Sequence, residues 1–225
     1  MHSVRRPQAD PHEDQPDDAK AAGRKAVAIQ CDVSSESSVK SMADQVNKTF
    51  GRADIVINTA GIFPQTNLDT LDFATWRKIL SVNLDGTFLV SMAFIPGMKQ
   101  RGWGRIISMS SSTLGSVVTG FVPYVSSKAG IVGFTRAMAT ELGPFGITVN
   151  AIQPGLTKTP GAMGRPPRAG FKTMDEEFAS VATMQAIKRP EETDDLVGAM
   201  SFLTSDDAAF ITGQTINVDG GRVRS

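Results

Sequence analysis

Apolar segments without polar alternation constrain the fold of this chain most strongly. The clearest are residues 53–61 (ADIVINTAG), 104–111 (GRIISMSS) and 147–155 (ITVNAIQPG), each of which runs into a polar or turn stretch. Segments with helical patterning separate them, including residues 34–51 and 124–146. Strands that are apolar on both faces are typical of a parallel sheet covered by helices on both sides. The sequence therefore predicts an α/β fold, in which ligands bind at the carboxyl ends of the strands.

The other expected elements continue this alternation. Residues 25–30 (KAVAIQ) and 214–221 (QTINVDGG) are expected to form strands. Further helices are expected near residues 72–84, 86–101, 175–187 and 191–204. Ser34 or Ser35 is expected to cap the helix over residues 34–51, and Gly51 to end it.

Composition narrows the function classes. The 225 residues carry zero formal net charge and 40% apolar residues, which suits one globular domain and gives no reason to expect nucleic acid or a membrane surface as partner. Residues 1–18 are rich in proline and acids, so we expect them to be disordered and residues 19–225 to form the domain. Cys31 is the only cysteine and no secretory signal is found, which favours a cytoplasmic location. Without a cysteine or histidine cluster, we expect no metal site.

The only tyrosine stands four residues before a lysine, in YVSSK (124–128). Inside a helix, residues four apart share a face, so Tyr124 and Lys128 would point the same way. A general base working at neutral pH needs the phenol pKa of ~10 lowered by roughly 3 pH units, and a fixed ammonium favours that direction. The pair is therefore a candidate acid–base site; the alternative is an ordinary surface pair with this common spacing.

Two polar positions extend the candidate site. Ser111 ends an expected strand, and its hydroxyl can donate to a substrate oxygen while Tyr124 handles its proton. The run of serines at 110–112 is also explained by a polar strand end with local backbone bonding. Asn83 lies within an expected helix, where asparagine is unfavourable, and could free a carbonyl for a water near Lys128. The alternative for Asn83 is a tolerated surface asparagine.

Six motifs resemble those of the short-chain dehydrogenase/reductase family. INTAGI, VNLDGTF, GRIISMSS, YVSSKAG, VNAIQPG and ITGQTINVDGG occur in that family's order and intervals over residues 19–225. FIPGMKQRGWGRII and SDDAAFITGQTINVDGG are similar to stretches of the 1-phenylethanol dehydrogenase type. The resemblance implies a three-layer, doubly wound (Rossmann-like) sheet. It also implies an enzyme that interconverts a secondary alcohol and a ketone by hydride transfer with NAD or NADP.

The resemblance implies a catalytic role for each candidate. Tyr124 would be the acid/base, and Lys128 would lower its pKa and bind the nicotinamide ribose. Ser111 would polarise the carbonyl, and Asn83 would hold a water on the proton relay. Ser112 is the second choice for the serine, because the spacing from Tyr124 favours Ser111.

Three groups of residues match the family's cofactor contacts. The adenine ring would be contacted by Asp32 and Val33, although Asp32 could equally be the cap of the helix over 34–51. The adenosine-side turn would be formed by Asn58, Ala60 and Gly61, with Thr59 where the family more often has asparagine. The loop over the nicotinamide would be formed by Pro154, Gly155, Thr157 and also Thr159.

The family's opening strand, glycine-rich TGxxxGxG turn, helix and second strand are not recognised in this sequence. We therefore expect a sheet missing its first two strands, which leaves a bare edge on the strand at 53–58 unless the strand at 25–30 moves in, another chain covers the edge, or the sequence is incomplete at its amino end. The pyrophosphate would lack its usual backbone amides. Ala9 and Asp10 are either a remnant of the second strand, which slightly favours NAD, or part of an acidic tail. The alternative function is a truncated, non-catalytic family member that no longer binds dinucleotide and acts, if at all, through subunit contacts.

The stretch 156–190 predicts the substrate class. Its apolar side chains suggest a lid over a small hydrophobic alcohol or ketone, unless they only pack that stretch onto the core; they are Met163, Phe171, Met174, Phe178 and Met184. The resemblance further implies a homo-oligomer, a tetramer or dimer, built through the helices at 86–101 and 124–142.

Overall fold

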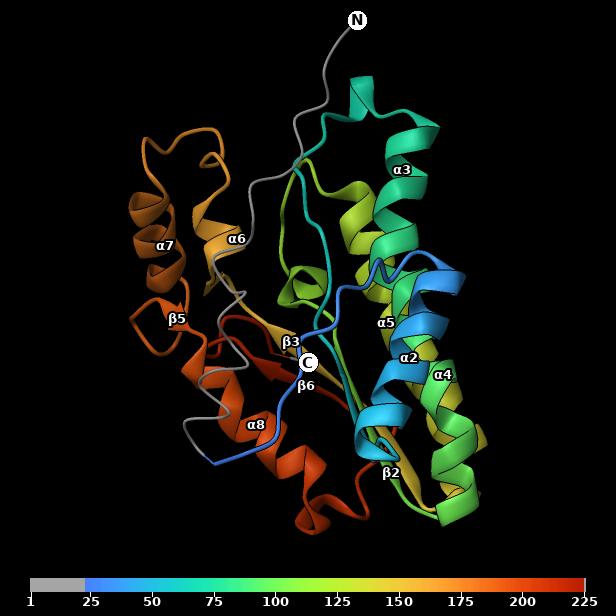
Figure 1. Cartoon of the computed structure of the whole chain (residues 1–225). Helices are drawn as coiled ribbons and strands as arrows, with labels where there is room; N and C mark the ends of the chain where they lie inside the picture. Colours follow the sequence, from blue (N-terminus) through green and yellow to red (C-terminus); the bar gives the residue numbers. More distant parts are fainter. Residues whose placement is uncertain (1–22, 225) are drawn as a thin grey trace, which may run out of the picture.

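A four-stranded parallel sheet forms the centre of the computed structural model, which describes residues 23–224 (Figure 1). The strand order is β1-β2-β3-β6, and the strands are β1 (Ile55–Asn58), β2 (Gly104–Met109), β3 (Ile147–Pro154) and β6 (Thr215–Val218). In this parallel register Ile57 lies beside Ile107, and Ile152 lies beside Ile216. The predicted α/β parallel sheet is confirmed.

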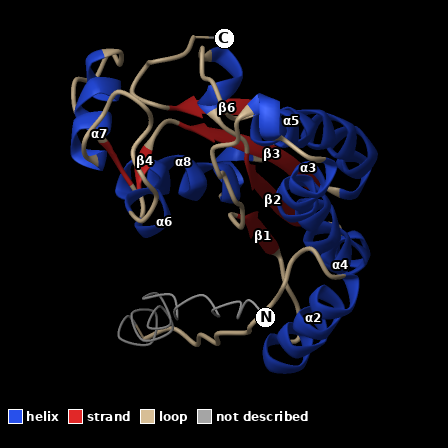
Figure 2. Cartoon of the chain, turned by 90° about the horizontal axis from the view of Figure 1, so that it is seen from above, coloured by secondary structure: helices blue, strands red, loops and turns tan. Residues whose placement is uncertain are grey.

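Helices cover the sheet on both faces (Figure 2). On one face lie α4 (Gly86–Arg101) and α5 (Val122–Leu142). Beside α4 lies α2 (Glu36–Phe50), whose Ala43 shares a core cluster with Val56 of β1. On the other face lies α8 (Asp194–Thr204), which contacts β2, β3 and β6. The result is the three-layer arrangement expected of the fold class.

Adjacent residues of β2 show why both faces need a cover. Successive side chains of a strand point to opposite faces. Ile106 packs with Met98 of α4, whereas its neighbour Ile107 packs with Leu203 of α8. Both isoleucines are fully buried, and each such burial is worth about 2 kcal/mol. An uninterrupted apolar strand is therefore stable only as the middle layer.

The start of α2 settles one of the alternatives for Asp32. Ser35 is the N-cap, since its side chain accepts from the Ser38 amide, and Gly51 ends the helix at φ 80°. Asp32 instead accepts from the amide and hydroxyl of Ser34, at 2.9 and 2.6 Å, in a turn before the helix. The interpretation of Asp32 as helix cap was wrong, because the serine stands in the position whose side chain reaches the free amide.

One long helix replaces the two expected at 72–84 and 86–101. α3 (Phe73–Leu80) continues through a π-helical turn, Ser81–Asp85, directly into α4. Residues 73–101 are long and apolar enough to cross a membrane by length and composition. Phe94, Ile95 and Met98 pack instead into the core against the sheet, which accounts for the apolar character.

The remaining elements lie around the carboxyl ends of the strands and in the connections. A small second sheet pairs β4 (Thr157–Lys158) with β5 (Glu191–Glu192), and the short helices α6 (Pro160–Met163) and α7 (Met174–Thr183) lie between them in sequence. Single 3₁₀ turns occur at Leu68–Thr70, Ser112–Gly115, Gly143–Phe145 and Asp206–Ala208.

The strand predicted at residues 25–30 is not formed. Within residues 23–224 no strand lies alongside this segment, so it has no ladder to join and Val27 stays 45% exposed. β1 consequently has one neighbour in the described chain, and its Ile55 and Ile57 are 44% and 41% exposed. The expectations for residues 1–18, including the strand remnant at Ala9 and Asp10, lie outside the described residues.

Candidate active site

The helix α5 places the predicted acid–base pair beside the end of β2. Tyr124 and Lys128 lie one turn apart, and the Lys128 ammonium is 5.7 Å from the centroid of the phenol ring. Pro123 in the first turn pre-sets the backbone for this helix start. The shared face that the i, i+4 spacing predicts is therefore present.

Tyr124 is half-buried between two phenylalanines. The rings of Phe63 and Phe121 meet it edge-on, each with centroids 6.1 Å away. Burial raises the pKa of the Tyr124 phenol, and a hydrogen bond with the Ser111 side chain opposes that rise. In this state the phenol keeps its proton at neutral pH and is ready to donate it.

Lys128 is fixed by the strand beside it. The residue is 4% exposed, and its ammonium donates to the carbonyl of Met109 at 2.7 Å, the one hydrogen bond it makes with the residues the structure describes. Burial lowers the pKa of Lys128 to about 8. A Cβ on Gly61 would lie 3.6 Å from this ammonium. The glycine therefore leaves open the space toward which the remaining ammonium hydrogens can donate.

Asn83 lies in the π-helical turn, a disturbance of the helix that agrees with the poor helix propensity of asparagine. The residue is fully buried. Its side-chain amide accepts from the Ile62 amide at 2.8 Å and donates to the Ile62 carbonyl at 2.9 Å and the Ser127 hydroxyl at 3.0 Å. Its own carbonyl accepts from the Thr87 hydroxyl at 2.8 Å. Asn83 thus ties the turn at Gly61 to α5, and the surface interpretation of this residue was wrong.

The two serines considered for the site have different surroundings. Ser111 caps the 3₁₀ turn over residues 112–115, and its oxygen accepts from the amide and the hydroxyl of Thr113 at 3.2 and 3.0 Å. Its own proton remains available to the phenol of Tyr124 or to a substrate oxygen. Ser112 is 1% exposed, and its carbonyl accepts from Ser116. Geometry therefore favours Ser111.

Part of the predicted adenosine-side set lines one pocket of about 240 Å³, whereas Gly61 lies outside that lining. Its lining includes Val33, Asn58, Thr59, Ala60 and, from the helix, Gly86. Gly86 allows close approach, because a Cβ there would lie 2.8 Å from Val33. The Asn58 side chain is buried and donates to Ser91 and Ser108, so it joins β1 to α4 and β2. Asp32 is exposed and lies outside the lining.

The loop after β3 depends on a residue that the sequence did not single out. Glu191 is 4% exposed, and its two oxygens accept from the amide of Gly155 at 2.9 Å and the hydroxyl of Thr157 at 2.5 Å. Pro154 precedes this contact as the last residue of β3. The hydroxyl of Thr159 is used to cap α6, where it accepts from the amide of Ala162 at 3.1 Å.

The apolar residues of the stretch 156–190 divide into two groups. Met174 and Phe178 are 7% and 1% exposed and pack with Leu156 and Phe63, so the packing interpretation holds for these two. Met163 and Met184 are 42% and 52% exposed, and Phe171 is half-buried. Because Phe63 also touches Tyr124, this packed cluster joins the stretch to the candidate site.

An ion cluster fastens the proline-rich part of this stretch to α7. Glu177 is fully buried and receives both Arg165 and Arg168 at 2.6 Å, together with the Arg168 amide at 2.9 Å. The hydrogen bonds from the two arginines and the Arg168 amide hold the pKa of Glu177 below its usual value against the opposing effect of burial.

The fold is that of an α/β protein, and its candidate site at the ends of the strands consists of a tyrosine, a lysine, a serine and an asparagine. The family model described as "Enoyl-(Acyl carrier protein) reductase" matches residues 7–222. An uncharacterised short-chain type dehydrogenase/reductase of Sinorhizobium fredii is 38% identical over 87% of this chain and 75% of its own length. The chain belongs to the short-chain dehydrogenase/reductase family of oxidoreductases.

Two further relatives show how far the likeness extends. The (2S)-[(R)-hydroxy(phenyl)methyl]succinyl-CoA dehydrogenase subunit BbsD of Thauera aromatica is 38% identical over 92% of this chain and 79% of its own length. A solved gluconate 5-dehydrogenase from Burkholderia cenocepacia, in complex with NADP and tartrate, superposes with a TM-score of 0.83 at 29% identity. That superposition covers 92% of this chain and 79% of the other.

Proposed function

We propose that this chain is an NAD(P)-dependent oxidoreductase that interconverts a secondary alcohol and a ketone. The observation that carries this proposal is the arrangement of Ser111, Tyr124 and Lys128, with a proton-donating serine and phenol beside a buried ammonium. The family supports a nicotinamide dinucleotide as cofactor, and NAD and NADP both remain candidates.

The residues around Lys128 fit the nicotinamide half of such a cofactor. The ammonium donates one hydrogen bond to the carbonyl of Met109. Because Gly61 has no side chain, the space next to the ammonium stays open. Lys128 and Tyr124 would therefore hold the ribose hydroxyls. Pro154, Gly155 and Thr157 would hold the nicotinamide. When bound, the cofactor supplies or accepts the hydride.

The adenosine half would be held by residues around the pocket of about 240 Å³. Val33, Asn58 and Ala60 line that pocket, and Asp32 directly precedes Val33 in the sequence. Asn58 would act by shaping the turn, since its amide is already spent on two serine hydroxyls.

In the reducing direction, the side chains handle the carbonyl oxygen. Ser111 donates a hydrogen bond to that oxygen and stabilises the charge that develops on it. Tyr124, whose phenol keeps its proton through burial, then donates that proton to the oxygen. The ammonium of Lys128 places a positive charge near the phenolate that this proton transfer leaves. Asn83 holds the Gly61 turn and Ser127 in place behind Lys128, the position from which it would order a water on the relay.

An apolar substrate suits the surroundings of the phenol. Phe63 and Phe121 flank Tyr124, and the exposed Met163 and Met184 lie in the stretch proposed as a lid. The name of the Thauera relative describes a carbinol carbon that carries a phenyl group. These features support a small hydrophobic, preferably aryl-substituted, secondary alcohol or ketone.

Titration with NADH and NADPH, followed by turnover at the nicotinamide absorbance with a panel of hydrophobic ketones, tests the proposal. We expect binding of at least one dinucleotide and oxidation of it by an aryl ketone. The alternative is a non-catalytic family member, and a folded chain without binding would support that alternative. Binding without turnover on the whole panel would overturn the substrate class and leave the cofactor assignment standing.

We also propose a cytoplasmic homo-oligomer, a tetramer or dimer, built through α4 and α5. Phe88 and Met92 of α4 are 46% and 41% exposed, and Phe88 meets Phe134 of α5 edge-on. This apolar stripe spans the two helices, and its burial against a second copy would remove it from water. Sedimentation of the wild type and of Phe88→Glu tests the assignment, since the variant should sediment as a smaller species.

A further inference from the structure

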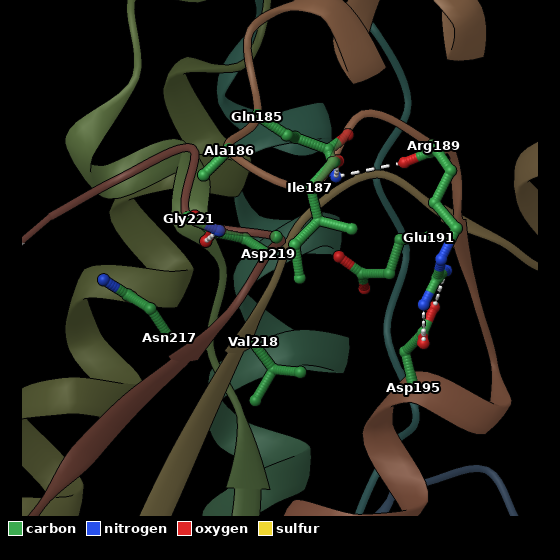
Figure 3. Close-up of a pocket in the computed structure, with 11 residues that line it drawn as sticks. Gln185, Ala186, Ile187, Arg189, Glu191, Asp195, Asn217, Val218, Asp219 and Gly221 are labelled. Carbon is green, nitrogen blue, oxygen red and sulfur yellow. Dashed lines mark hydrogen bonds and ion pairs between the residues drawn. The ribbon is translucent and has the colours of Figure 1, made fainter.

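The carboxylate of Glu191 connects the loop after β3 to a second region of the protein. The residue lies on β5, opposite Thr157 of β4 in the small parallel sheet. One side of it holds the loop, and the other side lines a pocket of about 410 Å³ (Figure 3). In that pocket Arg189 forms a two-point ion pair with Asp195, both contacts at 2.6 Å. Arg189 is therefore already paired, and both oxygens of Glu191 bond with the loop.

Glu191 packs so closely against the loop that a side chain at position 155 would clash with it. A Cβ on Gly155 would lie 2.6 Å from one oxygen of Glu191 and 3.3 Å from Asp219. The Gly155 amide donates to that oxygen and to the carbonyl of Val218 on β6. Glu191 thus fastens the end of β3 at the start of the loop proposed to hold the nicotinamide.

The direction of the second hydrogen bond has a chemical consequence. A carboxylate only accepts hydrogen bonds, so at the 2.5 Å contact the proton of the Thr157 hydroxyl points at Glu191. The hydroxyl oxygen then has only lone pairs to offer a ligand. A group bound by Thr157 must therefore be a hydrogen-bond donor, as the amide nitrogen of a carboxamide is.

The charges around Glu191 bear on this direction. Burial, together with Asp195 and Asp219, raises its pKa, while the bonds from Thr157 and Gly155 lower it. Arg189 faces it from the same connection but is paired with Asp195. The pKa of Glu191 is therefore higher than that of an exposed glutamate. Above that pKa the side chain is a carboxylate, the form that accepts from Thr157.

From this geometry we infer that Glu191 is a positioning residue, which acts through Thr157 to make the loop a hydrogen-bond acceptor selective for the carboxamide nitrogen of the nicotinamide. The inference rests on the proposed function, because it assigns a role toward that cofactor. It predicts discrimination against a dinucleotide whose carboxamide is replaced by a group that cannot donate, such as a methyl ketone.

Calorimetric titration with NAD and with 3-acetylpyridine adenine dinucleotide measures that discrimination directly, and it needs no turnover. The Glu191→Gln side chain can accept from Gly155 and donate to Thr157, which frees the threonine proton for the ligand. We expect the wild type to prefer NAD and Glu191→Gln to lose about three- to tenfold of that preference, the value of one hydrogen bond. The matched control is Glu192→Gln on the same strand, whose side chain is half exposed beside Lys158.

Hydrogen exchange at the loop gives a readout without cofactor. Peptides over residues 154–158 should exchange as in the wild type for Glu191→Gln, which keeps the loop fastened, and faster for Glu191→Ala. An unchanged NAD preference in Glu191→Gln, or a wild type that binds both dinucleotides equally, overturns the inference alone. If the wild type binds NADP in place of NAD, the same comparison is made with NADP and its 3-acetylpyridine analogue. A wild type that binds neither NAD nor NADP overturns the proposed function, and the inference with it.

Discussion

The ammonium of Lys128 lies 5.7 Å from the ring centroid of Tyr124, one turn along the same helix, and donates to the carbonyl of Met109 at the end of the neighbouring strand. Burial acts on both groups in the same sense, since it favours the neutral form of each. It raises the pKa of the phenol and lowers that of the ammonium to about 8. The sequence-based expectation that Lys128 lowers the phenol pKa was therefore wrong for this structure: burial raises that pKa, and the hydrogen bond with Ser111 is what opposes the rise.

Replacing Tyr124 with phenylalanine should remove turnover and leave dinucleotide binding nearly unchanged. The ring and its contacts with Phe63 and Phe121 stay, and only the proton donor is lost. General acid–base catalysis contributes about 10²- to 10⁴-fold, so kcat should fall by that much. Ser126→Ala, on the exposed side of the same turn of α5, is the control and should keep its rate. A Tyr124→Phe variant with the wild-type rate would exclude the phenol as the acid.

The raised pKa of Tyr124 predicts different pH profiles for the two reaction directions. Reduction uses the protonated phenol, so its rate should stay level through neutral pH and fall only in the alkaline range. Oxidation needs the phenolate as base, so its rate should rise with pH across the same range. Initial rates in both directions between about pH 6 and 10 measure this. Parallel profiles in the two directions would contradict the assignment.

Lys128→Met should stabilise the folded chain at neutral pH. The pKa of this lysine is about 8 in the folded chain, against 10.5 for a freely solvated lysine, so the unfolded chain binds more protons between those values. Stability of the wild type therefore rises from about pH 8 to about pH 10.5, and below pH 8 burial of the charge costs about 3 kcal/mol. The variant avoids that cost and loses about 1 kcal/mol with the bond to Met109.

Urea unfolding of the wild type and of Lys128→Met at neutral pH and near pH 10 measures this difference. The gain should be about 2 kcal/mol at neutral pH and should shrink toward pH 10. Lys40→Met on α2 is the control, because Lys40 is 77% exposed and its replacement should show no such pH dependence. A gain that does not change with pH would indicate better packing instead of a relieved charge.

The sheet could be predicted from sequence because the residues of each strand show by themselves that both of its faces are buried. An apolar residue at every position, as at Ile106 and Ile107, needs a cover on both faces wherever the strand lies. The segment at residues 25–30 has similar strand propensity but forms no strand, because a strand also needs a neighbour to supply hydrogen bonds. Propensity is local, whereas pairing depends on the rest of the sheet.

The candidate site could be predicted only in part, for a related reason. Tyr124 and Lys128 meet through helical periodicity, which is readable from four residues of spacing. Glu191 meets Gly155 across 36 residues, and Asn83 meets Ser127 across 44. No local pattern marks these contacts. The one signal for Glu191 was an acidic residue at the start of the helix expected near residues 191–204, which also fits a solvated helix start.

Glu177→Gln should loosen the proline-rich segment of the proposed lid. The change leaves Arg165 and Arg168 half-buried without a carboxylate, and breaking a buried ion cluster on one side costs about 3–5 kcal/mol. Trypsin should then cut after Arg168 faster than in the wild type, and KM for a hydrophobic ketone should rise. Asp175→Asn, exposed in the first turn of the same helix, is the control. Equal cutting of both variants would show that the cluster does not hold the segment.

The edge of β1 that pairs with no strand of residues 23–224 should make the wild type prone to open-ended association. Ile55 and Ile57 are 44% and 41% exposed beside backbone groups that pair with no other strand of residues 23–224. Such an apolar edge can template pairing with another chain, and a charge on it opposes that pairing. Ile55→Lys should therefore reduce light scattering on concentration or warming, whereas Val197→Lys, at a 58% exposed position on α8, should not. Equal scattering by both variants would show that the association does not depend on this edge.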